Sequence, residues 1–329
     1  MAKILEQISH YEKKILRASR LSKEEACTLS KTPHQYLFNL LTSADSIRNC
    51  FRGRSVQLCT IVNAKSGGCS EDCSFCAQSS KSNADIQIYP LLERNSILKQ
   101  ARNAKKAGAI RFSIVTSGRK VSKKDFTKIS DMIASIRDLG LLPCASLGML
   151  NADELSRLKA AGLDRYHHNL ETSRRFYKKV CNTHGYTEKT ETVKAALASG
   201  LSICSGGIFG MGETWRDRID MAFALRRLDV DSVPINFLIP IKGTPLENRE
   251  LLHPFEALKI IALYRFILPN KEIRICGGRL QVLNEFHPLI FLAGADSILT
   301  GNYLTPFGRV PADDIGMVRL CGLTLTDTS

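Results

Sequence analysis

The sequence contains no long hydrophobic run. No stretch reaches the roughly 18 consecutive apolar residues that a membrane-spanning helix needs, so we expect no membrane association. The first residues, Met1–Gln7, contain no apolar signal-peptide region and already include an acidic side chain. These two absences predict a cytoplasmic protein.

The sequence also lacks any basic run interleaved with aromatic residues. Its formal net charge of +14 would by itself suit an acidic partner such as nucleic acid. The lysines and arginines are scattered, however, in short pairs such as Lys13-Lys14 and Lys105-Lys106, and no motif of the known nucleic-acid-binding types is present. We therefore assign the charge to solvated helix faces and to holding an anionic substrate, and expect no nucleic-acid partner.

Cysteine, in contrast, is plentiful, with 11 residues. In a cytoplasmic chain of this size that number indicates metal or redox chemistry rather than disulfides. Three of them, Cys69, Cys73 and Cys76, lie within eight residues with the spacing C-x3-C-x2-C. Small and turn-forming residues surround them, so the loop can turn all three sulfurs toward one point. Thiolates are soft ligands that bind iron–sulfur clusters and zinc.

No fourth cysteine or histidine follows this loop closely, and the next histidine downstream is His167. A structural zinc site normally has four protein ligands. Three thiolates therefore fit an iron–sulfur cubane better, with one iron left open for a substrate or cofactor. A zinc knuckle stays open as the alternative, and with it a zinc-containing nucleic-acid-binding protein.

Beyond residue 54, apolar strand-like runs alternate with helical patterns, as is typical of a parallel α/β fold. About eight such units fit the length, so the sequence predicts a TIM-type (β/α)8 barrel. We divide the chain into an N-terminal helical extension (1–54), the barrel (55–310) and a C-terminal tail (311–329). The predicted strands cover residues 56–62, 110–115, 142–146, 166–171, 201–204, 233–238, 273–276 and 297–299.

Three further cysteines, Cys144, Cys204 and Cys276, each lie late in a different predicted strand and precede small residues. A single buried cysteine is usually inert packing, but three at equivalent strand positions predict a second metal site inside the barrel. Arg274 lies two residues before Cys276, so both side chains point to the same face. An inward arginine needs anionic partners, which a thiolate-bound cluster and a carboxylate substrate supply. The cysteines that we assign to packing or to the surface are Cys27, Cys50, Cys59, Cys181 and Cys321.

The C-x3-C-x2-C spacing resembles that of the radical S-adenosylmethionine (AdoMet) superfamily, and most of the chain resembles the biotin synthases within it. That resemblance implies sulfur insertion that converts dethiobiotin to biotin, with a 5′-deoxyadenosyl radical generated at a [4Fe-4S] cluster and an auxiliary iron–sulfur cluster as sulfur donor. A related radical AdoMet enzyme acting on another small substrate is the alternative. The segments that carry the resemblance are Asn63–Gly67, Cys69–Ser80, Gly162–Ser173, Cys204–Ile208, Ser232–Leu238, Gly243–Leu246, Glu272–Arg274 and Gly277–Arg279.

The resemblance also implies the residues and partners of the site. Cys69, Cys73 and Cys76 would bind the [4Fe-4S] cluster, and no catalytic residue beyond the cluster ligands is implied. The implied partners are dethiobiotin, an electron donor such as flavodoxin or ferredoxin, and a second copy of the chain in a homodimer. The residues implied to bind AdoMet are Phe75, Asn169, Glu171, Lys189 and Ile208; those implied to bind substrate are His167, Asn169, Asn236 and Arg274.

The sequence departs from the family pattern at the auxiliary cluster, which the family holds with three cysteines and an arginine. Cys144, Cys204 and Arg274 match, but Ser113 stands at the remaining cysteine position, and serine binds iron far less readily than a thiolate at neutral pH. Cys276 stands where the family has a small non-ligating residue. We therefore predict an auxiliary cluster, [2Fe-2S] or larger, held by Cys144, Cys204 and Cys276. Arg274 would be a ligand or charge partner, and Ser113 would stay unbound.

Two further departures lie near the predicted substrate. His167 stands where the family has an asparagine that helps to hold the substrate, and Lys189 stands where it has an arginine.

Overall fold

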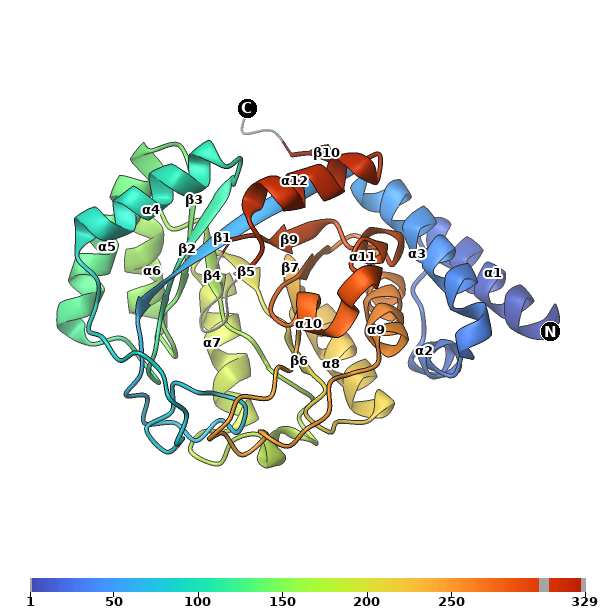
Figure 1. The fold of residues 1–329 in the computed structure, drawn as a ribbon, viewed down its shortest axis with the longest axis horizontal. Helices are drawn as coiled ribbons and strands as arrows, with labels where there is room; N and C mark the ends of the chain where they lie inside the picture. Colours follow the sequence, from blue (N-terminus) through green and yellow to red (C-terminus); the bar gives the residue numbers. More distant parts are fainter. Residues whose placement is uncertain (1, 302–307, 327–329) are drawn as a thin grey trace.

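Parallel strands and helices alternate along the chain, and the strands close into a barrel (Figure 1). The computed structural model describes residues 2–301 and 308–326; Met1, residues 302–307 of the predicted barrel domain and residues 327–329 of the predicted tail lie outside them. Neighbouring strands pair in parallel from the first to the last, and β9 pairs back onto β1. This closure confirms the TIM-type barrel. The barrel strands are β1 (Ser55–Lys65), β2 (Arg111–Thr116), β3 (Leu142–Ser146), β4 (Arg165–His167), β5 (Ser202–Cys204), β7 (Ser232–Phe237), β8 (Glu272–Ile275) and β9 (Ser297–Leu299).

The helices between these strands begin where local sequence signals favour a helix start. Asn151 and Glu154 form a reciprocal capping box at the start of α6, as their spacing predicts. Pro254 occupies the first turn of α9, where its missing N–H costs nothing. The helices that follow the barrel strands are α4 (Arg94–Lys106), α5 (Lys123–Asp138), α6 (Ala152–Ala160), α7 (Tyr186–Ala198), α8 (Trp215–Leu228), α9 (Pro254–Ile267), α10 (Arg279–Leu283), α11 (Leu289–Leu292) and α12 (Pro311–Leu320).

The sequence-based boundaries differ from the structure in a few places. The fourth strand ends at His167 rather than reaching Glu171, because the chain turns there and Glu171 adopts a left-handed backbone conformation with φ of 69°. Two short strands were not predicted, β6 (Gly207–Phe209), which pairs with β7, and β10 (Thr324–Leu325), which pairs with the start of β1. Both are too short to show a clear alternation in the sequence.

Residues preceding the barrel form α1 (Ala2–Leu16), α2 (Lys23–Ser30) and α3 (Leu37–Arg52), which lie together on the α8–α9 side of the barrel (Figure 1). The carboxylate of Asp296 joins this extension to the barrel. It accepts hydrogen bonds from Arg52 (2.7 Å) and from Arg265 (2.6 Å). None of the described helices has the length and apolar character needed to cross a membrane.

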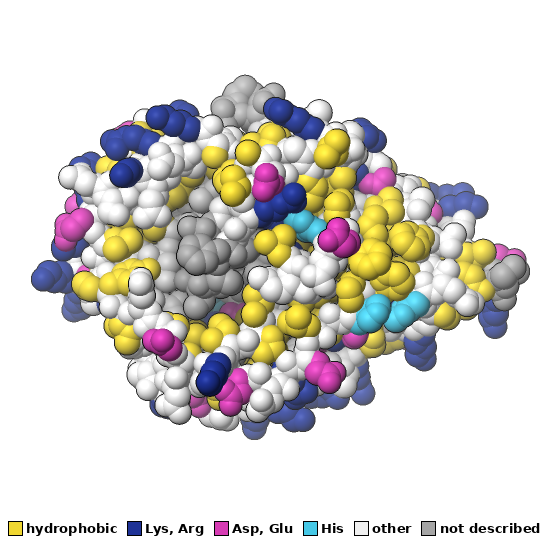
Figure 2. Space-filling model, viewed as in Figure 1, with side chains coloured by type: hydrophobic (Ala, Val, Ile, Leu, Met, Phe, Trp, Pro, Cys, Tyr) yellow, Lys and Arg dark blue, Asp and Glu magenta, His cyan; other side chains and the backbone are white. Residues whose placement is uncertain are grey.

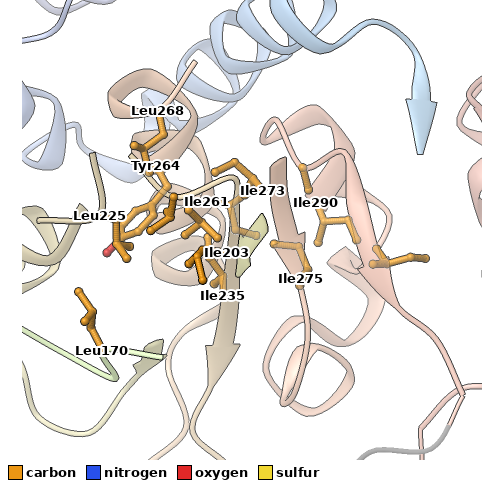
Figure 3. Close-up of a cluster of buried hydrophobic side chains, with 14 of the residues drawn as sticks. Leu170, Ile203, Leu225, Ile235, Ile261, Tyr264, Leu268, Ile273, Ile275 and Ile290 are labelled. Atoms are coloured by element: carbon orange, nitrogen blue, oxygen red, sulfur yellow. The ribbon is translucent and has the colours of Figure 1, made fainter. Parts of the chain in front are cut away.

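The two faces of the barrel wall have opposite character. Outward-facing side chains of the strands, such as Ile203, Ile235 and Ile273, pack against Ile261 and Tyr264 of α9 in a continuous apolar layer (Figure 3). Burial of this layer supplies the main stabilisation of the fold. The interior of the barrel, in contrast, is polar and rich in thiols.

On the surface, lysine and arginine side chains spread around the outline of the face drawn in Figure 2 instead of gathering in one patch.

Candidate active site

The three clustered cysteines lie on the loop between β1 and α4, at the carboxyl end of the first barrel strand. The loop folds back on itself: the Ser80 N–H donates to Cys69 O (2.7 Å) and the Cys69 N–H donates to Gln78 O (3.0 Å). Gly67, with φ of 75°, starts the turn, and a side chain there would collide with Ile88. Hydrogen bonds to the backbone therefore fix the path that carries the three sulfurs.

Two acidic residues within the loop anchor it to the segment that precedes α7. Asp72 Oδ1 accepts hydrogen bonds from the N–H groups of Asn182 (2.9 Å) and Thr183 (3.1 Å), and these bonds overcome the effect of burial and hold its pKa well below the usual value. The neighbouring Glu71 accepts from Thr183 Oγ1 (2.8 Å) and contacts His184 Nδ1. This anchoring network escapes sequence reading, because its two halves are more than a hundred residues apart.

Burial opposes the ionisation of two of the three loop thiols. Burial raises the pKa of Cys73 and of Cys76 above the usual value for a thiol. Sγ of Cys73 also lies close to Cys181 and His184, and the ligand atoms of all three residues are within 4.8 Å of one another. A metal that displaces the thiol proton is the physical route to a thiolate here. The loop thus suits a thiolate-bound cluster.

Next to this loop, at the carboxyl end of β4, the predicted AdoMet residues Asn169 and Glu171 meet the predicted Lys189. Burial raises the pKa of the Glu171 carboxyl, and Lys189 Nζ, 4.0 Å from its Oε1, opposes that shift. Glu171 Oε2 is buried and has no hydrogen-bond partner among the described residues. Gly207 passes so close to the Glu171 carbonyl that any side chain there would collide with it. The arrangement keeps one acceptor available to a polar ligand.

Two cavities open from these residues and share part of their lining. The first, of about 270 Å³, reaches into the barrel to His167, Lys189 and Arg274. The second, of about 320 Å³, is more apolar and is lined by Phe75 and Ile208. The residues that line both cavities are Ile61, Ser146, Asn169, Glu171, Asn236 and Leu299. Every residue predicted to bind AdoMet or substrate therefore lines one continuous region.

His167 and Asn236, both predicted to bind substrate, differ in whether their polar atoms already have hydrogen-bond partners. Burial, followed by the charges of Arg274 and Arg165, lowers the pKa of His167 well below its usual value, so its imidazole is neutral at pH 7. His167 Nδ1 lies 3.4 Å from Ser113 Oγ, and its Nε2 has no hydrogen-bond partner among the described residues. The amide of Asn236, in contrast, donates to Gly207 O (3.2 Å) and accepts from the Gly277 N–H (3.0 Å). The backbone thus orients Asn236 within the cavity wall.

Inside the barrel, Arg274 lies among the cysteines predicted to form the second metal site. Its Nη2 contacts Cys204 Sγ, whereas its Nε and Nη1 have no hydrogen-bond partner within the described ranges. Burial raises the pKa of Cys144 to about 12, against the attraction of Arg111, and raises that of Cys276 to about 12, against that of Arg274. These thiols too need a metal to ionise. The buried soft donors and the unsatisfied guanidinium fit an anionic metal cluster.

The structure does not bring Ser113 to either cavity. Its side chain is fully buried, as is that of Cys144, and neither residue lines the open space. Of the predicted auxiliary-site residues, Cys204, Arg274 and Cys276 line the first cavity. Two thiols that the sequence did not single out, Cys59 and Cys181, are buried beside the two predicted metal sites. A spacing pattern could not have identified them, because their neighbours come from other strands and loops.

Comparison with protein families finds two matches along the chain. Residues 64–225 match the radical SAM superfamily, and residues 234–324 match the Biotin and Thiamin Synthesis associated domain. Asn236, Arg274 and Cys276 lie within the second matched region, and the cysteine loop lies within the first.

Individual relatives cover nearly the whole chain. A biotin synthase of Thermodesulfovibrio yellowstonii is 54% identical over 288 residues, covering 88% of this chain and 91% of the relative. A biotin synthase of Pelotomaculum thermopropionicum is 48% identical over 307 residues, covering 93% and 96%. Among solved structures, methylornithine synthase superposes with a TM-score of 0.85 at 20% identity, covering 97% of this chain and 98% of that one. This last likeness concerns the fold alone.

Proposed function

Because the chain belongs to the biotin synthase family of radical AdoMet enzymes, we propose which of its residues carry out the sulfur insertion that converts dethiobiotin to biotin. The enzyme uses AdoMet, a [4Fe-4S] cluster and an auxiliary iron–sulfur cluster. When bound, these groups supply a 5′-deoxyadenosyl radical that removes hydrogen from carbon, and the sulfur that replaces it. The protein's own residues bind, orient and enclose the reactants.

In our proposal, Cys69, Cys73 and Cys76 hold the [4Fe-4S] cluster, and the polar part of AdoMet binds beside it. The unsatisfied Oε2 of Glu171 accepts a hydrogen bond from AdoMet, and Asn169 lies on the same wall. Phe75 and Ile208 contact the apolar part of the cofactor, since both line the more apolar cavity. Lys189 balances the charge of Glu171, from which it is 4.0 Å away.

Dethiobiotin occupies the deeper cavity, between AdoMet and the barrel interior. The amide of Asn236, fixed by two backbone hydrogen bonds, faces the polar ring of the substrate. The Nε2 atom of His167, neutral at pH 7, is available to it as a single donor or acceptor. Cys144, Cys204 and Cys276 hold the auxiliary cluster with Arg274 as ligand or charge partner, and Ser113 stays unbound.

One observation carries this assignment: the two cavities share six lining residues, including Asn169, Glu171 and Asn236. A substrate in front of the thiols would therefore lie next to the residues that would hold AdoMet. We further propose a cytoplasmic homodimer that receives electrons from flavodoxin or ferredoxin.

An anaerobic turnover assay on reconstituted protein tests the proposal. With AdoMet, a reductant and dethiobiotin, we expect both 5′-deoxyadenosine and biotin. Formation of 5′-deoxyadenosine without biotin would instead support a radical AdoMet enzyme with another substrate. Zinc in place of iron and sulfide in the purified protein would contradict the proposal at its base.

A further inference from the structure

A fourth thiol faces the interior of the barrel at the level of the auxiliary site. Cys59 lies on β1, is fully buried, and packs with Cys276 and Leu299 in a small cluster separate from the main hydrophobic core. Its strand neighbour Leu58, in contrast, points outward into that core. Cys59 thus shares the polar interior of the barrel with the other thiols.

The strand register shows which inward side chains lie in the same layer of the barrel as Cys59. In a TIM barrel, inward side chains fill layers of four that come from alternate strands. Cys59 on β1 pairs with Arg111 on β2, which pairs with Leu142 on β3. Cys144, two residues beyond Leu142 toward the carboxyl end, is therefore in the same layer as Cys59. The same step leads to Cys204 on β5 and then to Arg274 on β8. A fourth step returns to Cys59, as the barrel shear of about eight residues requires.

One layer therefore consists of three thiols and one arginine, Cys59, Cys144, Cys204 and Arg274. Ser113 belongs to the other set of strands, and its layer contains His167, Pro234 and Leu299. The layer that contains Ser113, which stands at a cysteine position of the family, thus offers no thiol. The layer that contains Cys59 offers three, and Cys276, two residues beyond Arg274, adds a fourth from the layer above it.

Arg274 provides a second, independent indication that this layer receives an anion. Its Nη2 contacts Cys204 Sγ, and the carboxylate of Glu272, which lies 4.0 Å from its Nε, is already paired with Arg165 at 2.7 Å. Two of its nitrogen atoms are buried and have no hydrogen-bond partner among the described residues. Buried donors of a charged group are rarely left unsatisfied. An anionic cluster held by the surrounding thiols would satisfy them.

We infer that Cys59 is a protein ligand of the auxiliary iron–sulfur cluster and completes a set of four thiolates with Cys144, Cys204 and Cys276. The inference rests on the proposed function, because it adds a ligand to the same auxiliary cluster. Four cysteines are the usual ligand set of a cubane iron–sulfur cluster, and the three thiols of this layer with the one in the next would supply that set. Arg274 then pairs with the charge of the cluster.

The test uses the full chain with Cys69, Cys73 and Cys76 all changed to alanine, so that bound iron reports on the auxiliary site alone. After anaerobic reconstitution, iron, sulfide and Mössbauer spectra are measured with and without Cys59→Ser. We expect the parent to bind an iron–sulfur cluster and Cys59→Ser to lose at least half of that iron. The exposed Cys50→Ser is the matched control and should retain all of it.

A rescue variant separates ligation from packing. Adding Ser113→Cys to Cys59→Ser places a thiol on the neighbouring strand, where the family has one, and should restore iron binding with a changed Mössbauer spectrum. A cysteine that only fills space would not be replaced in this way. Unchanged iron and spectra in Cys59→Ser would overturn the inference, whereas a parent that binds no iron would overturn the auxiliary site of the proposed function itself.

Folding is checked on the apoproteins by circular dichroism and thermal unfolding. If Cys59→Ser does not fold, an anaerobic crystal structure of the unmutated holoenzyme decides the matter. Cys59 Sγ bonded to iron supports the inference, and Cys59 Sγ out of bonding range contradicts it.

Discussion

The cysteine loop and the thiol layer of the barrel offer the same ligand chemistry but are built in different ways. Cys69, Cys73 and Cys76 lie within eight residues, and backbone hydrogen bonds within and around the loop set their positions. Cys59, Cys144 and Cys204 come from three different strands, and only the closed register brings them to one level. A site whose ligands are close in the sequence can therefore be predicted from their spacing, whereas a site whose ligands come from different strands can be identified only from the folded structure.

The two sites also differ in what surrounds them. Acidic residues hold the loop: Asp72 and Glu71 accept hydrogen bonds from the segment before α7. Basic residues lie around the barrel thiols: Arg111 Nη1 is 3.7 Å from Cys144 Sγ, and Arg274 contacts Cys204. A cationic setting stabilises thiolates and an anionic cluster deep in the protein. The comparison predicts that the two sites can be removed separately.

The largest expected effect is at the loop. Changing Cys73 to alanine should abolish both 5′-deoxyadenosine and biotin, because no radical forms without the [4Fe-4S] cluster. The barrel should remain folded and its auxiliary iron should remain bound, since the loop lies outside the core. Iron analysis and product assays check this, with Cys50→Ala as control. Persistent 5′-deoxyadenosine in the variant would contradict the role of the loop.

The complementary change is at the barrel layer. Cys204→Ala should abolish biotin while leaving 5′-deoxyadenosine formation within about threefold of the parent, because the loop cluster and the polar wall of the AdoMet site are unaltered. Measuring both products in one reaction gives the ratio directly. Equal loss of both products would show that the two sites are not separable.

A smaller effect is expected at the anchor of the loop. Asp72→Asn leaves the ligands in place but weakens the acceptor for the Asn182 and Thr183 N–H groups. Residues that orient metal ligands typically contribute about 10- to 100-fold to metal affinity or activity. We expect a loss of about tenfold in 5′-deoxyadenosine formation, with auxiliary iron unchanged. A rate equal to that of the parent would show that the loop holds its shape without this carboxylate.

The smallest effect concerns the scaffold that both sites share. Asp217 accepts hydrogen bonds from Thr214 and Ser173, which overcome the opposing effect of burial and lower its pKa. Because the folded-state pKa is depressed, its stabilisation is present above the unfolded value of about 3.9 and is lost as the pH falls through the folded value. Asp217→Asn should cost about 1–2 kcal/mol of unfolding free energy at pH 7, because it weakens hydrogen bonds to a charged acceptor. That difference should shrink below about pH 4, as urea unfolding at several pH values can measure.

The sequence predicted the eight barrel strands because their apolar runs alternate with helical patterns, and the structure confirms the barrel. It also identified Cys69, Cys73 and Cys76 as candidates, since their spacing is local. It could not identify Cys59 as more than a packing residue, because the residues that lie beside it in the structure, Cys276 and Leu299, are more than two hundred residues away in the sequence.

The anchor between Asp72 and Thr183 was missed for the same reason: hydrogen bonds between distant loops leave no periodic signal. Resemblance to a family aligned Ser113 with a ligand position, but only the register shows that the layer of Ser113 lacks thiols. Which residues share a layer depends on how the strands are staggered, and that is a property of the closed barrel.

The most direct test of the account compares two single substitutions in the barrel of the holoenzyme, Cys276→Ala and Ser113→Ala. Mössbauer spectra and iron counts of the reconstituted proteins report whether the auxiliary cluster remains. The account predicts that Cys276→Ala disrupts the auxiliary cluster and that Ser113→Ala leaves it intact. An intact cluster in Cys276→Ala together with its loss in Ser113→Ala would contradict the thiol assignment.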